Sequence, residues 1–257
     1  MVQRYVRVQS SAGIHYGLLQ LNREVIVLDA APWAGGQANG ETLGSDDYEL
    51  LTPCCPSKIV AIGRNYAKHA AEMGNEVPSY PLIFLKPPTA LQAPQQPIYY
   101  PSQLTRVDYE GELAVVIGCK ASSVSVEEAG NYIWGYTVAN DVTARDLQRT
   151  EQQWTRSKGF DTFCPLGPWI VPQINPDALL QTFINDNPQP VQSAPINQMV
   201  FSPGELIAFI SGVMTLLPGD VILTGTPQGI GPLQVGDRVR VEVEGIGSLE
   251  NPVVARS

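Results

Sequence analysis

The sequence predicts a strand-rich α+β fold, and three observations support this prediction. Short apolar segments separated by turns recur along the chain, whereas only a few stretches have the composition of helices. Glycine (23 residues) and proline (22 residues) are both frequent, which suits a turn-rich architecture with more strand than helix. With 257 residues and 44% hydrophobic content, the chain is long enough for one large domain, or for one domain with a small appendage.

The first 50 residues predict a small antiparallel meander, because short apolar segments alternate with turns. These segments are 5–8, 14–19 and 25–28. A looser, acidic segment at 40–47 follows, and the Pro-Cys-Cys-Pro stretch at 53–56 marks a junction. We therefore expect a small β domain over residues 1–53 and a larger domain over residues 54–257.

The larger domain contains further apolar runs of strand length. The predicted strands are 58–63, 82–86, 112–118, 132–139, 169–171, 221–224, 238–243 and 249–254. The predicted helices are 66–73, 126–131, 143–151 and 203–214. The first helix is alanine-rich, and Gly74 is a fitting stop for it. Strands thus outnumber helices, which predicts a strand-dominated α+β chain with few helices.

Composition excludes several classes of partner. The formal net charge of −9 argues against nucleic acid and anionic membranes. No apolar run reaches the roughly 18 residues of a membrane span, and the N-terminus lacks an apolar signal-peptide core. The four cysteines form no C-x-x-C pair, so we expect reduced, buried thiols in a cytoplasmic protein. With only two histidines, a zinc site of the usual type can hardly form, and any metal would be a hard cation held by oxygen.

Glu110 and Glu112 are two positions apart in a predicted strand, so their side chains point to the same face. The residues that follow are apolar on both faces, which indicates a strand that enters a core. Adjacent buried anions repel each other unless a cation or a proton lies between them. Asp141 follows the apolar strand at 136–139 and would complete a three-carboxylate site for Mg²⁺ or Mn²⁺. From spacing alone, solvated acids beside a turn are the commoner explanation.

Three further features have the residue types of an active site. His69 and Glu72 share one face of the predicted helix, where a carboxylate can make the imidazole a general base; a surface ion pair is the simpler alternative. Lys158 lies among glycine and aromatic residues and suits a proton donor or oxyanion partner, although exposed lysines are commoner. The glycine-rich turn at 223–232 can bind a substrate carboxylate through backbone N–H groups and a hydroxyl, and it is not a P-loop.

Taken together, six segments in one order make the chain resemble the fumarylacetoacetate hydrolase family, over about residues 54 to 255. The segments are 62–69, 84–87, 109–113, 140–148, 158–161 and 223–227. The resemblance is to the shorter branch of acylpyruvate hydrolases, oxaloacetate decarboxylases and hydroxyheptadienedioate isomerases. It implies a mixed β-roll catalytic domain with a small N-terminal domain, usually in a homodimer.

The resemblance also implies roles for individual residues. It assigns Glu110, Glu112 and Asp141 as the ligands of Mg²⁺ or Mn²⁺. It assigns His69 and Glu72, on a lid helix, as the pair that activates water, and Lys158 as the active-site lysine. The residues that it places against the substrate are Arg64, Arg145, Gln148 and Thr226.

One departure narrows the expected activity. The longer fumarylacetoacetate hydrolases have a further aspartate ligand near the lid, whereas residues 63–66 here contain no acid, which favours a smaller 2-oxo acid. We expect a metal-dependent enzyme that cleaves an acylpyruvate by hydrolysis or decarboxylates oxaloacetate through a metal-stabilised enolate. The alternatives are an isomerase or tautomerase of a 2-hydroxy-dienedioate or of oxaloacetate enol, and a non-catalytic dicarboxylate-binding module. The intact set of acids, His69, Glu72 and Lys158 favours an enzyme, because a pure binder needs no base.

Overall fold

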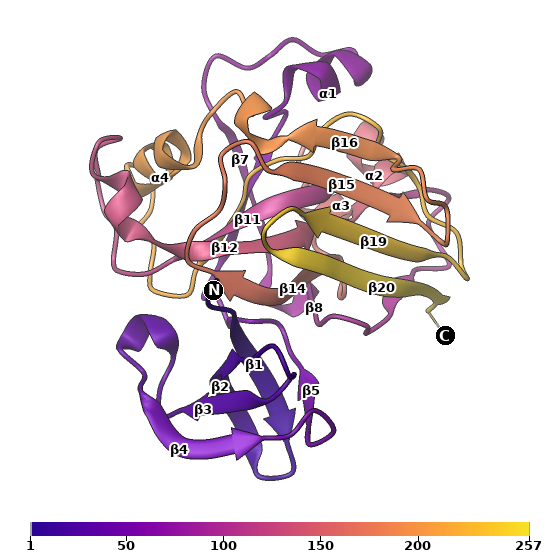
Figure 1. The fold of residues 1–257 in the computed structure, drawn as a ribbon. Helices are drawn as coiled ribbons and strands as arrows, with labels where there is room; N and C mark the ends of the chain where they lie inside the picture. The colour runs from indigo at the N-terminus through magenta and orange to yellow at the C-terminus, as the bar shows by residue number, and fades with distance from the viewer. Residues whose placement is uncertain (1, 257) are drawn as a thin grey trace.

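The structure is a computed structural model that describes residues 2–256. Five strands form a meander at the N-terminus, drawn from indigo to violet at the bottom of Figure 1. They are β1 (Tyr5–Ser10), β2 (Gly13–Leu19), β3 (Val25–Leu28), β4 (Ala38–Leu43) and β5 (Tyr48–Leu50). Buried valines of β1 and β3 share a small core of their own. The predicted meander is therefore present, whereas the division of the chain at residue 53 stays a prediction.

Strand β4 includes residues 40–43, the first half of the segment that the sequence predicts to be loose. The prediction of a loose segment is therefore wrong for these four residues. β4 pairs antiparallel with β3, with a register irregularity between Ile26 and Leu28. All of its residues except Leu43 are exposed. A strand without an apolar face has no hydrophobic alternation, and the sequence therefore gives no signal for it.

The largest sheet is mixed and has twelve strands. Ten of them follow the order β4-β3-β2-β1-β14-β12-β11-β17-β6-β7, while β5 pairs with β1 and β8 pairs with β14. Its strands beyond the meander are β6 (Ile59–Gly63), β7 (Leu82–Lys86), β8 (Leu91–Gln92), β11 (Gly111–Ile117), β12 (Ile133–Asn140), β14 (Cys164–Val171) and β17 (Val221–Leu223). The meander joins it through β1, where Tyr5 pairs with Ile170 of β14. All seven residues of β11 are buried, which confirms the expected strand inside a core.

A second, five-stranded sheet packs against the central part of the first, in front of β11, β12 and β14 in Figure 1. Its order is β16-β15-β19-β20-β9, with β9 (Ile98–Tyr100), β15 (Leu179–Ile184), β16 (Gln192–Pro195), β19 (Arg238–Val243) and β20 (Gly247–Ala255). A core cluster fills the space between the two sheets, with Leu113, Val138 and Val171 from one side and Leu180, Val241 and Leu249 from the other. Three short strands, β13 (Thr143–Ala144), β10 (Val107–Tyr109) and β18 (Gly231–Pro232), form a third sheet.

Helices are few and short, as the sequence predicts. They are α1 (Ala67–Glu72), α2 (Arg145–Thr150), α3 (Thr155–Lys158) and α4 (Pro203–Ser211). The helix predicted at 126–131 is instead a 3-10 turn at Ala129–Tyr132, and the one predicted at 143–151 begins with strand β13. α4 packs its buried leucine and isoleucines against Val115 of β11, Val60 of β6 and Ile222 of β17, on the same face of β11 that Leu113 presents to the second sheet. No helix among residues 2–256 has the length and apolar character of a membrane span.

The cysteines only partly follow the prediction. Cys54 and Cys164 are buried, whereas Cys55 and Cys119 are exposed, and all four are free thiols. Burial raises the pKa of the Cys164 thiol to about 12, with a smaller contribution from acidic neighbours. The expectation of buried thiols is therefore wrong for Cys55 and Cys119. Cys119 is exposed because it lies beyond the end of the buried strand β11.

Candidate active site

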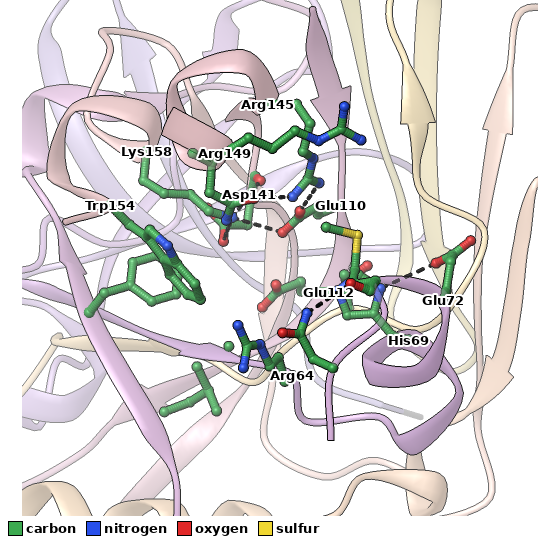
Figure 2. A pocket seen from close by; sticks show the side chains of 17 residues that line it. Arg64, His69, Glu72, Glu110, Glu112, Asp141, Arg145, Arg149, Trp154 and Lys158 are labelled. Atoms are coloured by element: carbon green, nitrogen blue, oxygen red, sulfur yellow. Dashed lines mark hydrogen bonds and ion pairs between the residues drawn. The ribbon is translucent and has the colours of Figure 1, made fainter. Parts of the chain in front are cut away.

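A cavity of about 430 Å³ opens between α1, α2, α3 and the ends of strands of the large sheet. Every site residue that the sequence predicts lines this one cavity: Arg64, His69, Glu72, Glu110, Glu112, Asp141, Arg145, Gln148, Lys158 and Thr226. Figure 2 shows how most of these side chains converge on its centre. The individual roles of these residues stay predictions, but their proximity makes a shared chemistry possible.

The three carboxylates meet because β11 and β12 pair antiparallel, with Gly111 opposite Asn140. Glu110 precedes β11, Glu112 is its second residue, and Asp141 follows the end of β12. Each side chain offers an oxygen within 4.8 Å of the other two, and all three residues are buried. Backbone bonds fix this corner: the Asp141 N–H donates to the Glu110 carbonyl at 2.8 Å, and the Glu110 N–H donates to Asn140 Oδ1 at 2.9 Å.

Two buried lysines contact this cluster. Lys158 Nζ lies 2.8 Å from Glu110 Oε2 and 2.5 Å from Asp141 Oδ2. Lys86 Nζ lies 2.6 Å from Asp141 Oδ1, and Lys86 itself does not line the cavity. Burial alone would lower the pKa of Lys158, but Asp141 and Glu110 outweigh it and raise that pKa. Lys158 therefore carries a positive charge at neutral pH between two of the three acids.

Arg145 links Glu110 to one further buried acid, Asp108. Its guanidinium pairs with Glu110 and donates from Nε to Asp108 Oδ2 at 2.9 Å. Arg106 also binds Asp108, at 2.7 and 3.0 Å. Burial would raise the pKa of Glu110, but the charges of Lys158 and then Arg145 lower it well below its ordinary value. Gln148, one turn after Arg145 on α2, accepts a hydrogen bond from its guanidinium.

Glu112 lacks such compensation. Burial, and then the negative charge of Asp141, raise the pKa of Glu112 well above its ordinary value. Its carboxylate accepts a hydrogen bond from the Gly225 N–H at 2.7 Å, and no ion pair with a residue among 2–256 reaches it. A buried acid of this kind fits a hard divalent cation, which prefers carboxylate oxygens and would supply the missing positive charge. The donor set therefore suits Mg²⁺ or Mn²⁺.

The histidine–glutamate pair is on α1, to one side of the carboxylates. His69 Nδ1 lies 3.3 Å from Glu72 Oε2, and His69 is 6% exposed. Glu72 is fixed in turn by the Gly229 N–H, 3.0 Å from its Oε1. Because a carboxylate only accepts hydrogen bonds, Nδ1 carries the proton of this contact, and Nε2 is not engaged by Glu72. Figure 2 shows this pair on one side of the acids and Trp154 on the other.

Sequence reasoning missed several residues of the cavity and its surroundings. Arg149 lines the cavity, four positions after Arg145; this i, i+4 spacing on a helix was a usable signal. Trp154 and Phe84 form an apolar wall, with ring centroids 5.2 Å apart. The side chain of Trp154 packs so closely on Gly63 that a Cβ there would lie 2.7 Å from a ring carbon. No local sequence pattern predicts this wall, because Gly63, Phe84 and Trp154 come from three separate segments.

A strand-rich fold with two packed sheets, and a buried acidic cluster suited to a divalent cation, define the class of protein. The family model described as "Fumarylacetoacetate (FAA) hydrolase C-terminal" matches residues 58–254, and a model described as "Rv2993c-like, N-terminal" matches residues 3–53. The chain belongs to the fumarylacetoacetate hydrolase family. The predicted family and the predicted strand-rich fold with a small N-terminal domain are therefore confirmed.

Three relatives indicate the range of activities within the family. The mitochondrial oxaloacetate tautomerase fahd2 of Xenopus laevis is 43% identical, over 84% of this chain and 72% of that protein. The structure of a 2-hydroxyhepta-2,4-diene-1,7-dioate isomerase from Mycobacterium marinum is 41% identical, with a TM-score of 0.91 over 99% of each chain. The fumarylpyruvate hydrolase of Pseudomonas aeruginosa, solved with Mn²⁺ and pyruvate, is 32% identical, with a TM-score of 0.74 over 83% of this chain and 94% of that one.

Proposed function

We propose that this protein is an Mg²⁺- or Mn²⁺-dependent enzyme that acts on small 2-oxo acids with a second carboxylate, by way of an enolate. The observation that supports it most is the cluster of Glu110, Glu112 and Asp141, three buried acids with one of them uncompensated. A divalent ion held there would chelate the 2-oxo acid and stabilise negative charge on the enolate oxygen. The Mn²⁺ and pyruvate of the fumarylpyruvate hydrolase structure support this choice of ligands.

The charges around the cavity favour a substrate with two negative charges. Four cationic side chains line it, namely Arg64, Arg145, Arg149 and Lys158, together with four carboxylates, namely Glu72, Glu110, Glu112 and Asp141. These formal charges cancel when His69 is neutral, so a bound divalent ion leaves two positive charges for the substrate to balance. Arg64 and Arg149 form no ion pair with any residue among 2–256, which leaves both guanidinium groups available for a distal carboxylate.

We infer that the reaction is a proton transfer at the carbon next to the 2-oxo group, as in keto–enol conversion of oxaloacetate. Relatives named tautomerase and isomerase are 43% and 41% identical to this chain. His69 is the base in this proposal, because Glu72 holds Nδ1 and leaves Nε2 to take and return the proton. Lys158 and Arg145 hold Glu110 ionised and in place throughout.

Hydrolysis of an acylpyruvate is the second candidate, and the same pair of residues favours it. A buried imidazole oriented by a carboxylate is what activation of water requires. Water would then attack the distal carbonyl, and carbon–carbon cleavage would release the enolate of pyruvate. Decarboxylation of oxaloacetate needs no attacking water, and it would proceed through the same enolate. The homodimer stays an expectation from the resemblance, and the cytoplasmic location stays an expectation from the cysteines.

A substrate screen tests these proposals. The purified protein is assayed with oxaloacetate enol, oxaloacetate, acetylpyruvate and fumarylpyruvate, with Mg²⁺, with Mn²⁺ and with EDTA. We expect metal-dependent turnover of at least one of them, loss of this turnover in EDTA, and loss of metal binding and turnover together in Glu110→Gln and Asp141→Asn. Full activity in EDTA or in both variants would refute a metal mechanism. Binding of these acids without turnover of any would instead identify a non-catalytic module.

A further inference from the structure

The glycine between the two glutamates has both of its backbone polar groups bonded to side chains. The Gly111 N–H donates to Gln192 Oε1 at 3.0 Å, and the Gly111 carbonyl accepts from Thr226 Oγ1 at 2.8 Å. Both hydrogen bonds are buried. Because Gly111 lies between Glu110 and Glu112, any rotation of its peptide groups would redirect both carboxylates.

Gln192 lies at the centre of this arrangement and uses its full hydrogen-bonding capacity. It is the first residue of β16 and 1% exposed. Its Oε1 accepts from Gly111 and from Thr182 Oγ1, the latter at 2.8 Å. Its Nε2 donates to Thr226 Oγ1 and to the Pro227 carbonyl, each at 2.8 Å. An amide has two lone pairs and two N–H groups, so a flipped amide would place its N–H groups against the Gly111 N–H and its oxygen against the Pro227 carbonyl.

The close approach of the second sheet explains why a glycine stands at position 111. A Cβ there would lie 2.3 Å from Thr182 Oγ1, 2.9 Å from Val241 Cγ1 and 3.3 Å from Gln192 Oε1. Gly111 is absent from the residues with positive φ, so space and not backbone conformation demands the glycine. The segment of the two glutamates is thus pressed against side chains of β15, β16 and β19.

We propose that Gln192 is a positioning residue of the metal site, which fixes the Gly111 peptides and so the directions of Glu110 and Glu112. This inference depends on one part of the proposed function, namely that the three acids bind a divalent ion. Thr226 belongs to the same clamp, because the single proton of its hydroxyl is donated to Gly111. Partners of ligating groups that fix their orientation typically change metal affinity about 10–100-fold when they are removed.

The test compares Mn²⁺ binding by Gln192→Met, Thr182→Val and Gln181→Met, with free Mn²⁺ measured by its EPR signal. Gln181 is a matched control, because it is on the same hairpin and its side chain hydrogen-bonds only to Ser193 among residues 2–256. We expect Gln192→Met to bind Mn²⁺ about 10–100-fold more weakly than the unmodified protein. Thr182→Val, which removes one of the two donors to Oε1, should show a smaller loss, and Gln181→Met should bind normally.

A purely structural role for Gln192 would lower the melting temperature without changing the affinity of the folded protein for Mn²⁺. Binding is therefore measured well below the melting temperature, and excess Mn²⁺ should restore activity to Gln192→Met. Unchanged Mn²⁺ affinity in folded Gln192→Met would overturn the inference and leave the proposed function standing. If Gln192→Met does not fold, unchanged affinity in Thr182→Val overturns it instead. An unmodified protein that binds no Mn²⁺ would overturn the proposed function and the inference together.

Discussion

Replacing Glu112 with glutamine should make the metal-free protein more stable while removing its response to metal. The amide keeps an oxygen that can accept the Gly225 N–H, so the local hydrogen bond survives. What disappears is the cost of burying a charged carboxylate, together with its repulsion by acids whose oxygens lie within 4.8 Å of it. With an effective dielectric constant of about 20, one such pair at that distance repels by roughly 3 kcal/mol.

Lys158 offsets part of this repulsion through Glu110 and Asp141, so we expect a net gain of about 1–3 kcal/mol at pH 7. In a domain of this size about 1 kcal/mol corresponds to roughly 2–4 °C, which predicts a melting temperature higher by roughly 2–12 °C. In the unmodified protein, Mn²⁺ at about 100 times its dissociation constant should add about 2.7 kcal/mol. Glu112→Gln should lose most of that increment.

Thermal melts by circular dichroism, with EDTA or with Mn²⁺, measure both effects. Glu127→Gln is the matched control, since Glu127 is exposed and has no hydrogen bond or ion pair through its side chain with residues 2–256. It should change stability by less than about 0.5 kcal/mol in either condition. A metal-free Glu112→Gln protein that melts below the unmodified one would show that the charge of Glu112 does not destabilise the cluster. Stabilisation of Glu112→Gln by Mn²⁺ as strong as that of the unmodified protein would show that Glu112 is not a metal ligand.

Three other changes test separate parts of the account. His69→Gln should lower the rate of proton transfer or hydrolysis by about 10²–10⁴ and decarboxylation far less, with Mn²⁺ affinity unchanged in titrations; equal losses in all reactions would argue against a base. Lys86→Met removes the partner of a buried Asp141 oxygen and should cost about 3–5 kcal/mol in denaturant unfolding, whereas an unchanged midpoint would show that the pair is not needed. Ser202→Ala removes the capping box of α4 and should cost about 1 kcal/mol at pH 7. Because Ser202 lowers the pKa of Glu205, that cost should shrink as the pH falls below 4.5, and a constant cost would contradict this coupling.

A local rule predicts that Glu110 and Glu112 lie together, whereas the placement of Asp141 beside them was a hypothesis that the order of the family motifs favoured. Two residues two positions apart on a strand share a face, and Asp141 follows a strand that pairs with theirs. The helix that carries His69 and Glu72 was predictable from its alanine content and i, i+3 spacing. The order and spacing of the motifs were therefore enough to predict most residues of the candidate site.

Long-range contacts were not predictable from one sequence. Gln192 reaches Gly111 across 81 positions, and the pairing of β15 with β19 that brings it there leaves no local signature. Lys86 ends an apolar strand, and its sequence alone does not distinguish a buried ion pair from an exposed lysine. The exposed strand β4 and the polar strand β16 were missed because neither has an alternating apolar face.

The most direct test of the central claim is a crystal structure with Mn²⁺ and oxalate, an unreactive mimic of the chelating end of a 2-oxo acid. Anomalous scattering locates Mn²⁺ independently of any assumption about its ligands. We expect one strong peak between the oxygens of Glu110, Glu112 and Asp141, with oxalate bound to the same ion. A peak elsewhere, or carboxylates without Mn²⁺ at saturating concentration, would contradict it.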